Sequence, residues 1–150
     1  MANTQTSIAT GRSSVLCLID FSASSENALR AAVQLAVKNA AHITILYPYR
    51  LTTAVKKENL VKLKRDIDLE ALRNFEKISH LLDGTNIDFD FRSEVGFLSD
   101  RIQEHLRLGN IKLIVLNKGL ADSSFEALAE LVPHLQVPLI LVPDGNPIAL

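Results

Sequence analysis

Two short segments of this chain contain only apolar residues, VLCLI at positions 15–19 and LIVL at positions 113–116. A strand that is apolar along its whole length must be covered on both faces, which is typical of the central strands of a parallel sheet. Around these segments, apolar residues recur at spacings of three and four, as they do on one face of a helix. The alternation of the two patterns predicts βαβ units and an α/β fold with helices on both faces of an open parallel sheet.

The pattern predicts five strands and four helices. The strands are expected at 15–19, 43–47, 87–91, 111–116 and 139–142, and the helices at about 28–37, 55–82, 98–106 and 124–131. Asn39 is a candidate left-handed stop for the first helix. Ile87, Phe89 and Phe91 alternate strictly with charged residues. That alternation indicates a strand at the sheet edge with one face in water.

Length and charge limit the class of protein. The chain has 150 residues, which is the usual length of one domain. Residues 1–13 lack an apolar period, so we predict a flexible tail followed by a single domain over 14–150. The 16 basic and 17 acidic side chains give a net charge of −1, which disfavours nucleic acid or an anionic membrane as the main partner.

The sequence also predicts a compartment. Charged and polar residues interrupt every apolar run well before the ~18 residues that span a bilayer. The first residues, MANTQTSIATGRSS, do not match a signal peptide. A single cysteine, Cys17, excludes an internal disulfide and fits a reducing environment. We therefore expect a cytoplasmic protein in which Cys17 is an inert core residue.

The first candidate site residue is Asp20, at the end of the first strand. In an open parallel sheet, ligands bind beyond the carboxyl ends of the strands. The Asp20 carboxylate is suited to a ribose hydroxyl or a magnesium ion. The alternative, which we favour, is that Asp20 or Ser22 caps the following helix by accepting backbone N–H bonds.

The second candidate is the connection after the fourth strand, Asn117–Ser124, where a phosphate cradle would form. Such a cradle needs several glycines, and this segment has only Gly119. Ser123 and Glu126 match a capping box, so we favour a tight connection that caps its own helix. Lys118 is available as a point charge for a phosphate, although an ordinary surface lysine is the simpler interpretation.

Other chemistry finds little support in the sequence. The four histidines fall in four different predicted elements without ligand spacing, so no metal site is expected. Neither a nucleophile elbow nor a Walker motif is present. The basic run at 62–65 is interrupted by a leucine and followed by two aspartates, which indicates a solvated helix face with i, i+4 partners.

The last predicted strand indicates an interaction between chains. Its sequence, flanked by Pro138 and Pro143, is apolar throughout, and an uncovered edge strand of this kind invites pairing. A two-fold homodimer would bury it in both copies. The predicted interface residues are Val137, Leu139, Ile140, Leu141 and Val142. The alternative is that the chain's own tail covers the strand.

These segments together resemble the universal stress protein family. The resemblance is carried by VLCLIDFS at 15–22, by SEVG at 93–96, by KLIVL at 112–116 and by VPLILVP at 137–143. It covers about residues 15–144. It implies a Rossmann-like, three-layer fold of the adenine nucleotide alpha hydrolase type, with strand order 3-2-1-4-5, and commonly a homodimer through the fifth strand.

The resemblance also bears on ATP, because some members of that family bind it and others do not. Members that bind ATP carry Gly-x-x-Gly, nine residues, then Gly and Ser or Thr after the fourth strand. Here Asn117 stands at the first glycine position, and only three residues separate Gly119 from Ser123. The position that reads adenine through its main chain matches Pro48, which lacks an N–H. The family's acidic residue at Asp20 is retained.

We therefore expect a dimeric stress-response or regulatory module without catalytic turnover, without a bound cofactor and without a competent ATP loop. The alternative is a nucleotide-binding member that holds ATP or AMP in a non-standard way. The candidate cleft residues for it are Asp20, Pro48, Asn117, Lys118, Gly119, Ser123 and Ser124. An enzymatic role lacks an identifiable acid, base or nucleophile pair. An unidentified small ligand in the cleft remains a further alternative.

Overall fold

The structure is a computed structural model that describes residues 12–51 and 56–143. Its strands are β1 (Ser14–Leu18), β2 (His42–Tyr49), β3 (Phe89–Val95), β4 (Ile111–Asn117) and β5 (Leu139–Val142). Its helices are α2 (Ser25–Asn39), α3 (Lys57–Ile78), α4 (Leu98–Leu108), α5 (Lys118–Ser123) and α6 (Phe125–Leu131), with 3₁₀ turns η1 (Ser79–Leu82) and η2 (Val132–His134).

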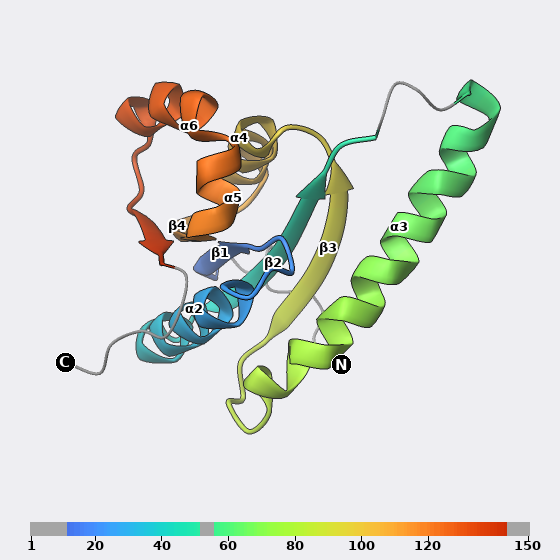
Figure 1. Cartoon of the computed structure of the whole chain (residues 1–150). Helices are drawn as coiled ribbons and strands as arrows, with labels where there is room; N and C mark the ends of the chain where they lie inside the picture. The colour runs from blue at the N-terminus through green and yellow to red at the C-terminus, as the bar shows by residue number, and fades with distance from the viewer. Residues whose placement is uncertain (1–11, 52–55, 144–150) are drawn as a thin grey trace.

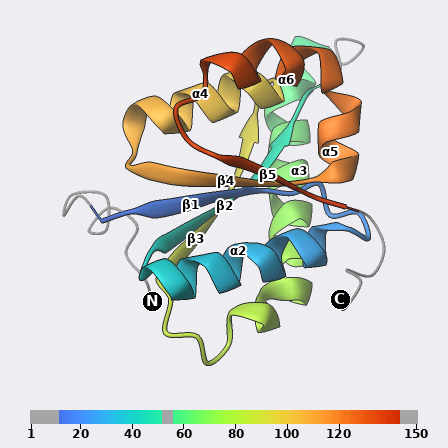
Figure 2. The same cartoon turned by 90° about the vertical axis from the view of Figure 1, so that its left-hand side faces the viewer.

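The five strands form one parallel sheet with the order β3-β2-β1-β4-β5 (Figure 1). This is the order expected from the family resemblance, with β1 at the centre and β3 and β5 at the two edges. The edge position predicted for the third strand is confirmed, and so is the interior position of the first and fourth strands. Helices cover both faces, so the fold is a three-layer α/β sandwich (Figure 2).

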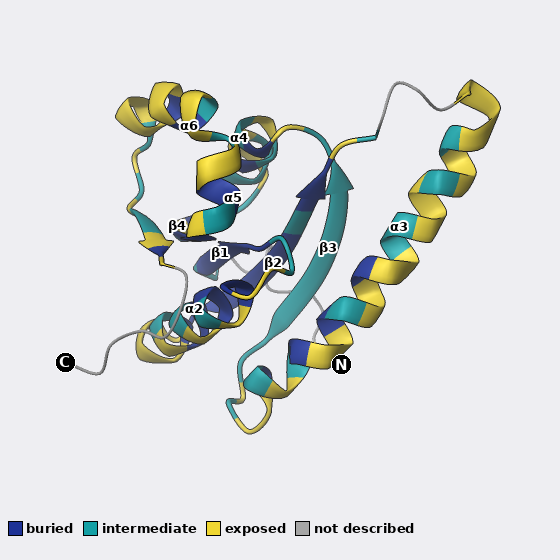
Figure 3. Ribbon diagram, viewed as in Figure 1, coloured by how far each residue is buried: buried dark blue, intermediate teal, exposed yellow. Residues whose placement is uncertain are grey.

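Alternate residues of the central strands pack into two separate hydrophobic cores, one on each face of the sheet. Val15, Cys17 and their neighbours on one face pack against α2, η1 and the C-terminal end of α3. Leu16 and Leu18 on the other face pack against α4, α5 and α6. The apolar run at 15–19 is fully buried on both sides, as Figure 3 shows by its dark colour. Burial raises the pKa of the Cys17 thiol to about 12, which makes this residue the inert core cysteine that was expected.

Several boundaries differ from those predicted. The second strand extends to Tyr49 and the third begins at Phe89, because pairing between these two strands continues to Tyr49 and Val95. The left-handed residue after α2 is Ala40, with φ of 51°, so the role predicted for Asn39 is wrong. The Asn39 amide instead donates to the carbonyl of Leu35, one turn back in the helix. The fourth predicted helix, at 124–131, corresponds to α6, and the additional helix α5 lies in the segment that was predicted to be a connection.

The first residues of the described chain are tied to the sheet. The sequence analysis placed Arg12 and Ser13 in the flexible tail. In the structure, Arg12 forms an ion pair with Asp88 at 2.6 Å, and the carbonyl of Ser13 accepts the N–H of His42 at 2.9 Å. The rest of the predicted tail, and residues 144–150, lie outside the described residues. In the described part of the chain, no helix is both long and apolar enough to cross a membrane.

Candidate functional site

The candidate site lies at the carboxyl ends of β1 and β4, where the chain leaves the sheet toward opposite faces. After β1 the chain continues into α2 on one face, and after β4 it continues into α5 and α6 on the other (Figure 2). This is the switch point at which open α/β sheets place their ligands. The residues at the two strand ends, Asp20 and Asn117, are brought together here from 97 positions apart in the sequence.

Asn117 fills this switch point with its own side chain. The residue is completely buried, and its Nδ2 donates to Asp20 Oδ1 at 3.1 Å, Ser22 Oγ at 3.3 Å and Ser24 Oγ at 2.9 Å. Its Oδ1 atom is buried without a hydrogen-bond partner among the described residues. We call Asp20, Ser22, Ser24, Ser25 and Asn117 the switch-point cluster. It joins the turn after β1, the start of α2 and the end of β4.

Asp20 is the acceptor of this cluster and not a helix cap. Its Oδ1 accepts the backbone N–H of Ser22 at 2.9 Å and the hydroxyl of Ser25 at 3.2 Å. The helix itself begins later, and its N-cap residue Ser24 makes no side-chain capping bond. The predicted cap by Asp20 or Ser22 is therefore wrong, because Asp20 closes a turn that precedes the helix. Partial burial would raise the pKa of Asp20, but the hydrogen bonds from Ser22, Asn117 and Ser25 outweigh it and lower the pKa below its usual range.

The turn between β1 and α2 is held by Phe21. This residue has a φ of 62°, in the left-handed region, which costs a residue with a Cβ roughly 1–2 kcal/mol. Its ring lies 5.0 Å from the ring of Tyr47 and 6.0 Å from that of Phe91. These aromatic contacts offset the backbone strain and fix the turn that presents Ser22 and Ser24 to Asn117.

The segment after β4 is helical, although a loop was expected. Helix α5 begins at Lys118, directly after the strand, and ends at Ser123. The Lys118 ammonium pairs with Asp122 at 2.6 Å, one turn along the helix. Ser123 donates its hydroxyl to the carbonyl of Leu120. The predicted capping box is wrong, because the N-cap of α6 is Ser124 and it makes no side-chain capping bond.

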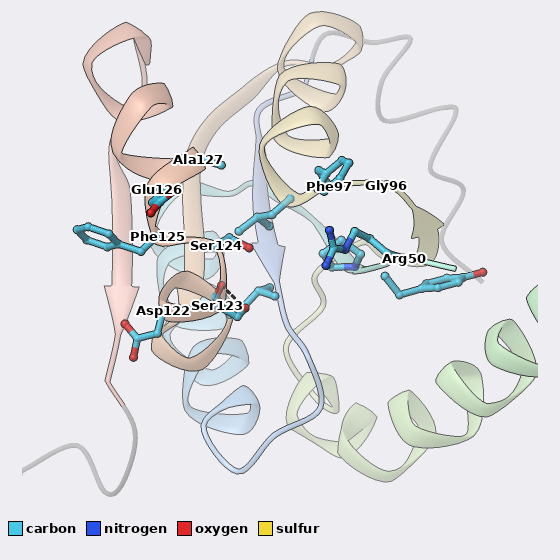
Figure 4. A pocket seen from close by; sticks show the side chains of 13 residues that line it. Arg50, Gly96, Phe97, Asp122, Ser123, Ser124, Phe125, Glu126 and Ala127 are labelled. Atoms are coloured by element: carbon cyan, nitrogen blue, oxygen red, sulfur yellow. Dashed lines mark hydrogen bonds between the residues drawn. The ribbon is translucent and has the colours of Figure 1, made fainter. Parts of the chain in front are cut away.

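A cleft of about 720 Å³ opens beside the switch-point cluster, on the α4 and α6 side of the sheet. Arg50 and Phe97 lie on one side of it, and α5 and α6 contribute the segment 122–127 on the other (Figure 4). The Arg50 guanidinium lies 4.7 Å from the centre of the Phe97 ring. Three of the candidate cleft residues predicted from the sequence, Pro48, Ser123 and Ser124, line this cleft. The lining does not include Asp20, Asn117, Lys118 or Gly119.

The role assigned to Pro48 needs correction. Pro48 does not follow the second strand but lies inside β2, opposite Glu94 of β3. Leu46 is the last residue of β2 that pairs with β1, so the missing N–H of Pro48 removes no bond from that ladder. The residue that follows β2 is Arg50, which keeps its backbone N–H. Pro48 therefore does not exclude adenine, and only the segment after β4 bears on nucleotide binding.

Two histidines pair with carboxylates away from the cleft. His42 Nε2 lies 2.7 Å from Asp90 Oδ1, and His105 Nε2 lies 2.9 Å from Glu94 Oε1. The hydrogen bond from His105 lowers the pKa of Glu94 and outweighs its partial burial. No group of three or more potential metal ligands occurs within residues 12–51 and 56–143. These pairs therefore join β2, β3 and α4 as structural contacts.

Gly96, which lines the cleft between β3 and α4, allows a direct test of this geometry. Its φ is +147°, and an added Cβ would lie 2.9 Å from Arg101 Nε. We expect Gly96→Ala to lower the free energy of unfolding by about 2 kcal/mol through backbone strain and this overlap. Urea unfolding measures the change. Gly84→Ala is the control, since Gly84 has a φ of +73° with nothing within 4 Å, and strain alone should cost about 1 kcal/mol there. Equal losses for the two variants would contradict the predicted contact with Arg101.

Comparison with known proteins shows which family this chain belongs to. A sequence profile of the universal stress protein family matches residues 11–119. The chain belongs to the universal stress protein family. A search of curated proteins found no match. The profile match covers β1 through the start of α5 and therefore includes both halves of the switch-point cluster.

Solved universal stress proteins share the fold. A family member from Burkholderia pseudomallei has 20% sequence identity and a TM-score of 0.65, with 89% of this chain and 98% of that chain covered. UspA from Lactobacillus plantarum has 18% identity and a TM-score of 0.66, with 87% and 97% covered. A universal stress protein from Archaeoglobus fulgidus in complex with dAMP has 14% identity and a TM-score of 0.61, with 87% and 97% covered. At these identities the likeness concerns the fold.

The candidate residues predicted from the sequence lie at the carboxyl ends of the strands, but they do not include every residue that lines the cleft. Arg50, Phe97 and the start of α6 carry no motif that distinguishes them in the sequence. The three serines at positions 22, 24 and 25 were visible as a run. Their joint contact with Asn117 was not, because it depends on the distance between two strand ends.

Proposed function

We propose that this universal stress protein is a homodimeric stress-response or regulatory module that acts without catalytic turnover and without bound ATP. The observation that carries the proposal is the switch-point cluster, in which Asn117 is fully buried against Asp20, Ser22 and Ser24. At this position the Asn117 amide N–H groups and the Asp20 Oδ1 atom are already hydrogen-bonded within the cluster, and Asn117 Oδ1 is its one buried atom without a partner among the described residues. On this proposal, the protein signals through its surface and its partners.

The segment after β4 supports the absence of an ATP cradle. A triphosphate is held by several backbone N–H groups in a glycine-rich loop. Here those residues are wound into α5, and Lys118 is engaged by Asp122. A Cβ at Gly119 would lie 3.5 Å from both Asn117 Nδ2 and Asp20 Oδ2, so side chains already pack against this glycine. The described residues therefore do not fit a triphosphate.

The β5 edge supports a homodimer. β5 carries no charged side chain, whereas the opposite edge strand, β3, carries Asp90, Arg92 and Glu94. Charges on an edge strand discourage pairing with another chain, so β5, which has none, is the edge at which such pairing is favoured. Leu139 and Leu141 also line a groove of about 620 Å³, together with Phe125, Leu128 and Val132. A second copy is the partner that fits such an edge in a closed two-fold assembly.

The five predicted interface residues contribute unequally to this surface. Val142 is buried, Ile140 packs against the core on the α2 face, and Val137 and Leu139 pack against the core on the other face. Leu141 leaves 53% of its surface exposed. Leu141 is therefore the side chain that a partner would bury. The alternative cover, the chain's own C-terminal tail, lies outside the described residues.

The cleft composition supports a role without catalysis. The residues that line it include no histidine and no cysteine, and its acidic groups, Asp122 and Glu126, are exposed side chains of α5 and α6. A general acid or base needs a positioned partner and a pKa matched to its task. The single cysteine of the chain, Cys17, is buried and fits the cytoplasmic location that we propose.

The second candidate is a nucleotide-binding role that uses the 720 Å³ cleft instead of the switch point. The Archaeoglobus fulgidus relative in complex with dAMP favours it. In this chain, Arg50 offers a guanidinium and Ser123 and Ser124 offer hydroxyls beside a space large enough for a nucleoside monophosphate. Asp20, Lys118 and Gly119 do not line that space, so the mode of binding would be non-standard. Another small ligand with an anionic group would meet the same side chains.

The nucleotide content of freshly purified protein distinguishes the two candidates. The protein is denatured, and the released small molecules are separated and identified by mass spectrometry. We expect no adenine nucleotide in stoichiometric amount. About one nucleotide per chain would replace the proposal by the second candidate. A different molecule in stoichiometric amount would identify the ligand of the cleft.

A further inference from the structure

The N-terminal part of α3 extends beyond the body of the protein. None of residues 57–70 is buried, and the buried residues of the helix, Ala71, Phe75 and Ile78, all lie toward its C-terminal end. Figures 1 and 3 show the helix diverging from β3 as it approaches its N-terminus. Two hydrogen bonds hold this part to the sheet within the described chain: Asp68 accepts the hydroxyls of Tyr49 and Ser93, each at 2.8 Å.

The projecting part nevertheless continues the apolar stripe of the core. Leu60, Leu63 and Ile67 follow the same spacing of three and four as Ala71 and Phe75, so they lie on the same helix face. All three are only partly buried. A solitary helix of about 12–15 residues is marginal in water, and most helices are stabilised by packing of their apolar face. This stripe therefore lacks the cover that the rest of the helix has.

Charge is segregated along the same part of the helix. Residues 56–65 contain five basic side chains and one carboxylate, whereas residues 66–70 contain three carboxylates and no basic side chain. Lys62 and Lys64 pair with Asp66 and Asp68 along the helix. Lys56, Lys57 and Arg65 form no ion pair with the described residues. If a second helix of the same sequence runs antiparallel to the first, its basic segment lies against the acidic segment of the first helix. Its acidic segment then lies against the basic segment of the first helix.

We propose that α3 packs antiparallel against α3 of a second copy of this chain. The contact joins the apolar stripe of Leu60, Leu63 and Ile67 in both copies and matches basic to acidic segments at both ends. Such a contact is two-fold and isologous, which lets it close. It lies on the β3 side of the sheet, opposite the β5 edge, so both contacts can form on one chain (Figure 1). Together they assemble more than two chains.

A charge-swap experiment tests this contact apart from the β5 edge. The background carries Leu141→Asp, which removes pairing through β5. In about 50 mM salt, where charges are screened over roughly 14 Å or more, we expect this background to dimerise at about 200 μM and to dissociate at about 0.5 M salt. The acidic variant adds Lys56→Glu, Lys57→Glu and Arg65→Glu. The basic variant adds Asp66→Lys and Glu70→Lys, and leaves Asp68 in place to hold Tyr49.

Each variant alone should be monomeric in sedimentation velocity, because its α3 helices now repel one another. A 1:1 mixture should restore a dimer that contains one chain of each kind, with an affinity at least tenfold above that of either variant alone. Circular dichroism confirms that both variants keep their helix content. A monomeric background at about 200 μM, or a mixture that associates no better than its components, would overturn the proposal. Binding of the monomer to phosphatidylglycerol vesicles would assign the stripe to an anionic lipid surface and overturn it as well.

Discussion

Replacing Asn117 by aspartate is expected to lower the free energy of unfolding by about 4 kcal/mol at pH 7, a large part of the total stability of an ordinary domain. Asn117 is fully buried and donates to Asp20 at 3.1 Å. The substitution replaces this donor by a second carboxylate, so two like charges face each other with little water to screen them. Chemical denaturation of wild type and variant measures the difference.

The loss depends on pH in a way that identifies its cause. The introduced carboxylate lies beside Asp20 in a buried position, so its pKa in the folded protein lies above its pKa in the unfolded chain. Its penalty is full above the folded pKa, decreases as the pH falls through that value, and vanishes below the unfolded pKa of about 3.9. Asp20 acts in the opposite direction in the wild type. Its pKa is lowered, so the stability that it contributes is full at neutral pH and is lost as the pH falls through its folded value.

Two controls accompany this variant. Combining it with Asp20→Asn exchanges the carboxylate and the amide within the pair, and should recover at least half of the lost stability. Asn59→Asp makes the same chemical change at an exposed position of α3 and should alter stability by less than about 0.5 kcal/mol. If Asn117→Asp is as stable as wild type, or if the exchange recovers nothing, the switch-point cluster does not hold the strand ends together.

Leu141→Asp is expected to convert the protein from dimer to monomer at about 10 μM in about 0.5 M salt, where exposed charge contacts are screened and apolar contacts persist. Leu141 is exposed in the single chain and borders the groove beside β5. A charge at this position would be buried in the centre of the proposed contact, at a cost of at least 2 kcal/mol, or roughly 30-fold in the dissociation constant. Light scattering coupled to size-exclusion chromatography measures the mass.

Leu108→Asp is the matched control, since Leu108 is 60% exposed at the end of α4 and lies outside the groove. This control should remain dimeric. Ile140, another of the predicted interface residues, is a poorer choice because its side chain packs against the core and a charge there would also unfold the chain. Wild type that is monomeric under these conditions, or a dimer that survives Leu141→Asp, would contradict an interface through β5.

The sheet was predictable because its signals are local. The runs at 15–19 and 113–116 are apolar on both faces, and that property alone places their strands inside the sheet. Apolar and charged residues alternate at 87–91, so one face of that strand is in water, and this local pattern placed the third strand at an edge. The strand order itself came from the family resemblance, because hydrophobic periodicity does not say which strands are neighbours.

The details of the site were not predictable because they depend on contacts between distant residues. Ser123 and Glu126 have the spacing of a capping box, but Ser123 is the last residue of α5 and its hydroxyl bonds inside that helix. Pro48 resembles the end of a strand, yet β2 continues past it because its pairing with β3 extends to Tyr49. Asn117 and Asp20 were separate candidates in the sequence. Their pairing follows from the parallel register of β1 and β4.

Titration calorimetry with Mg²⁺ and ATP tests the central claim, that the chain's own side chains occupy the switch point and leave no cradle for three phosphates. Wild-type protein at about 100 μM should show a dissociation constant weaker than about 100 μM, or no measurable heat. Saturable binding of one ATP per chain with a dissociation constant of a few micromolar or less would contradict the account.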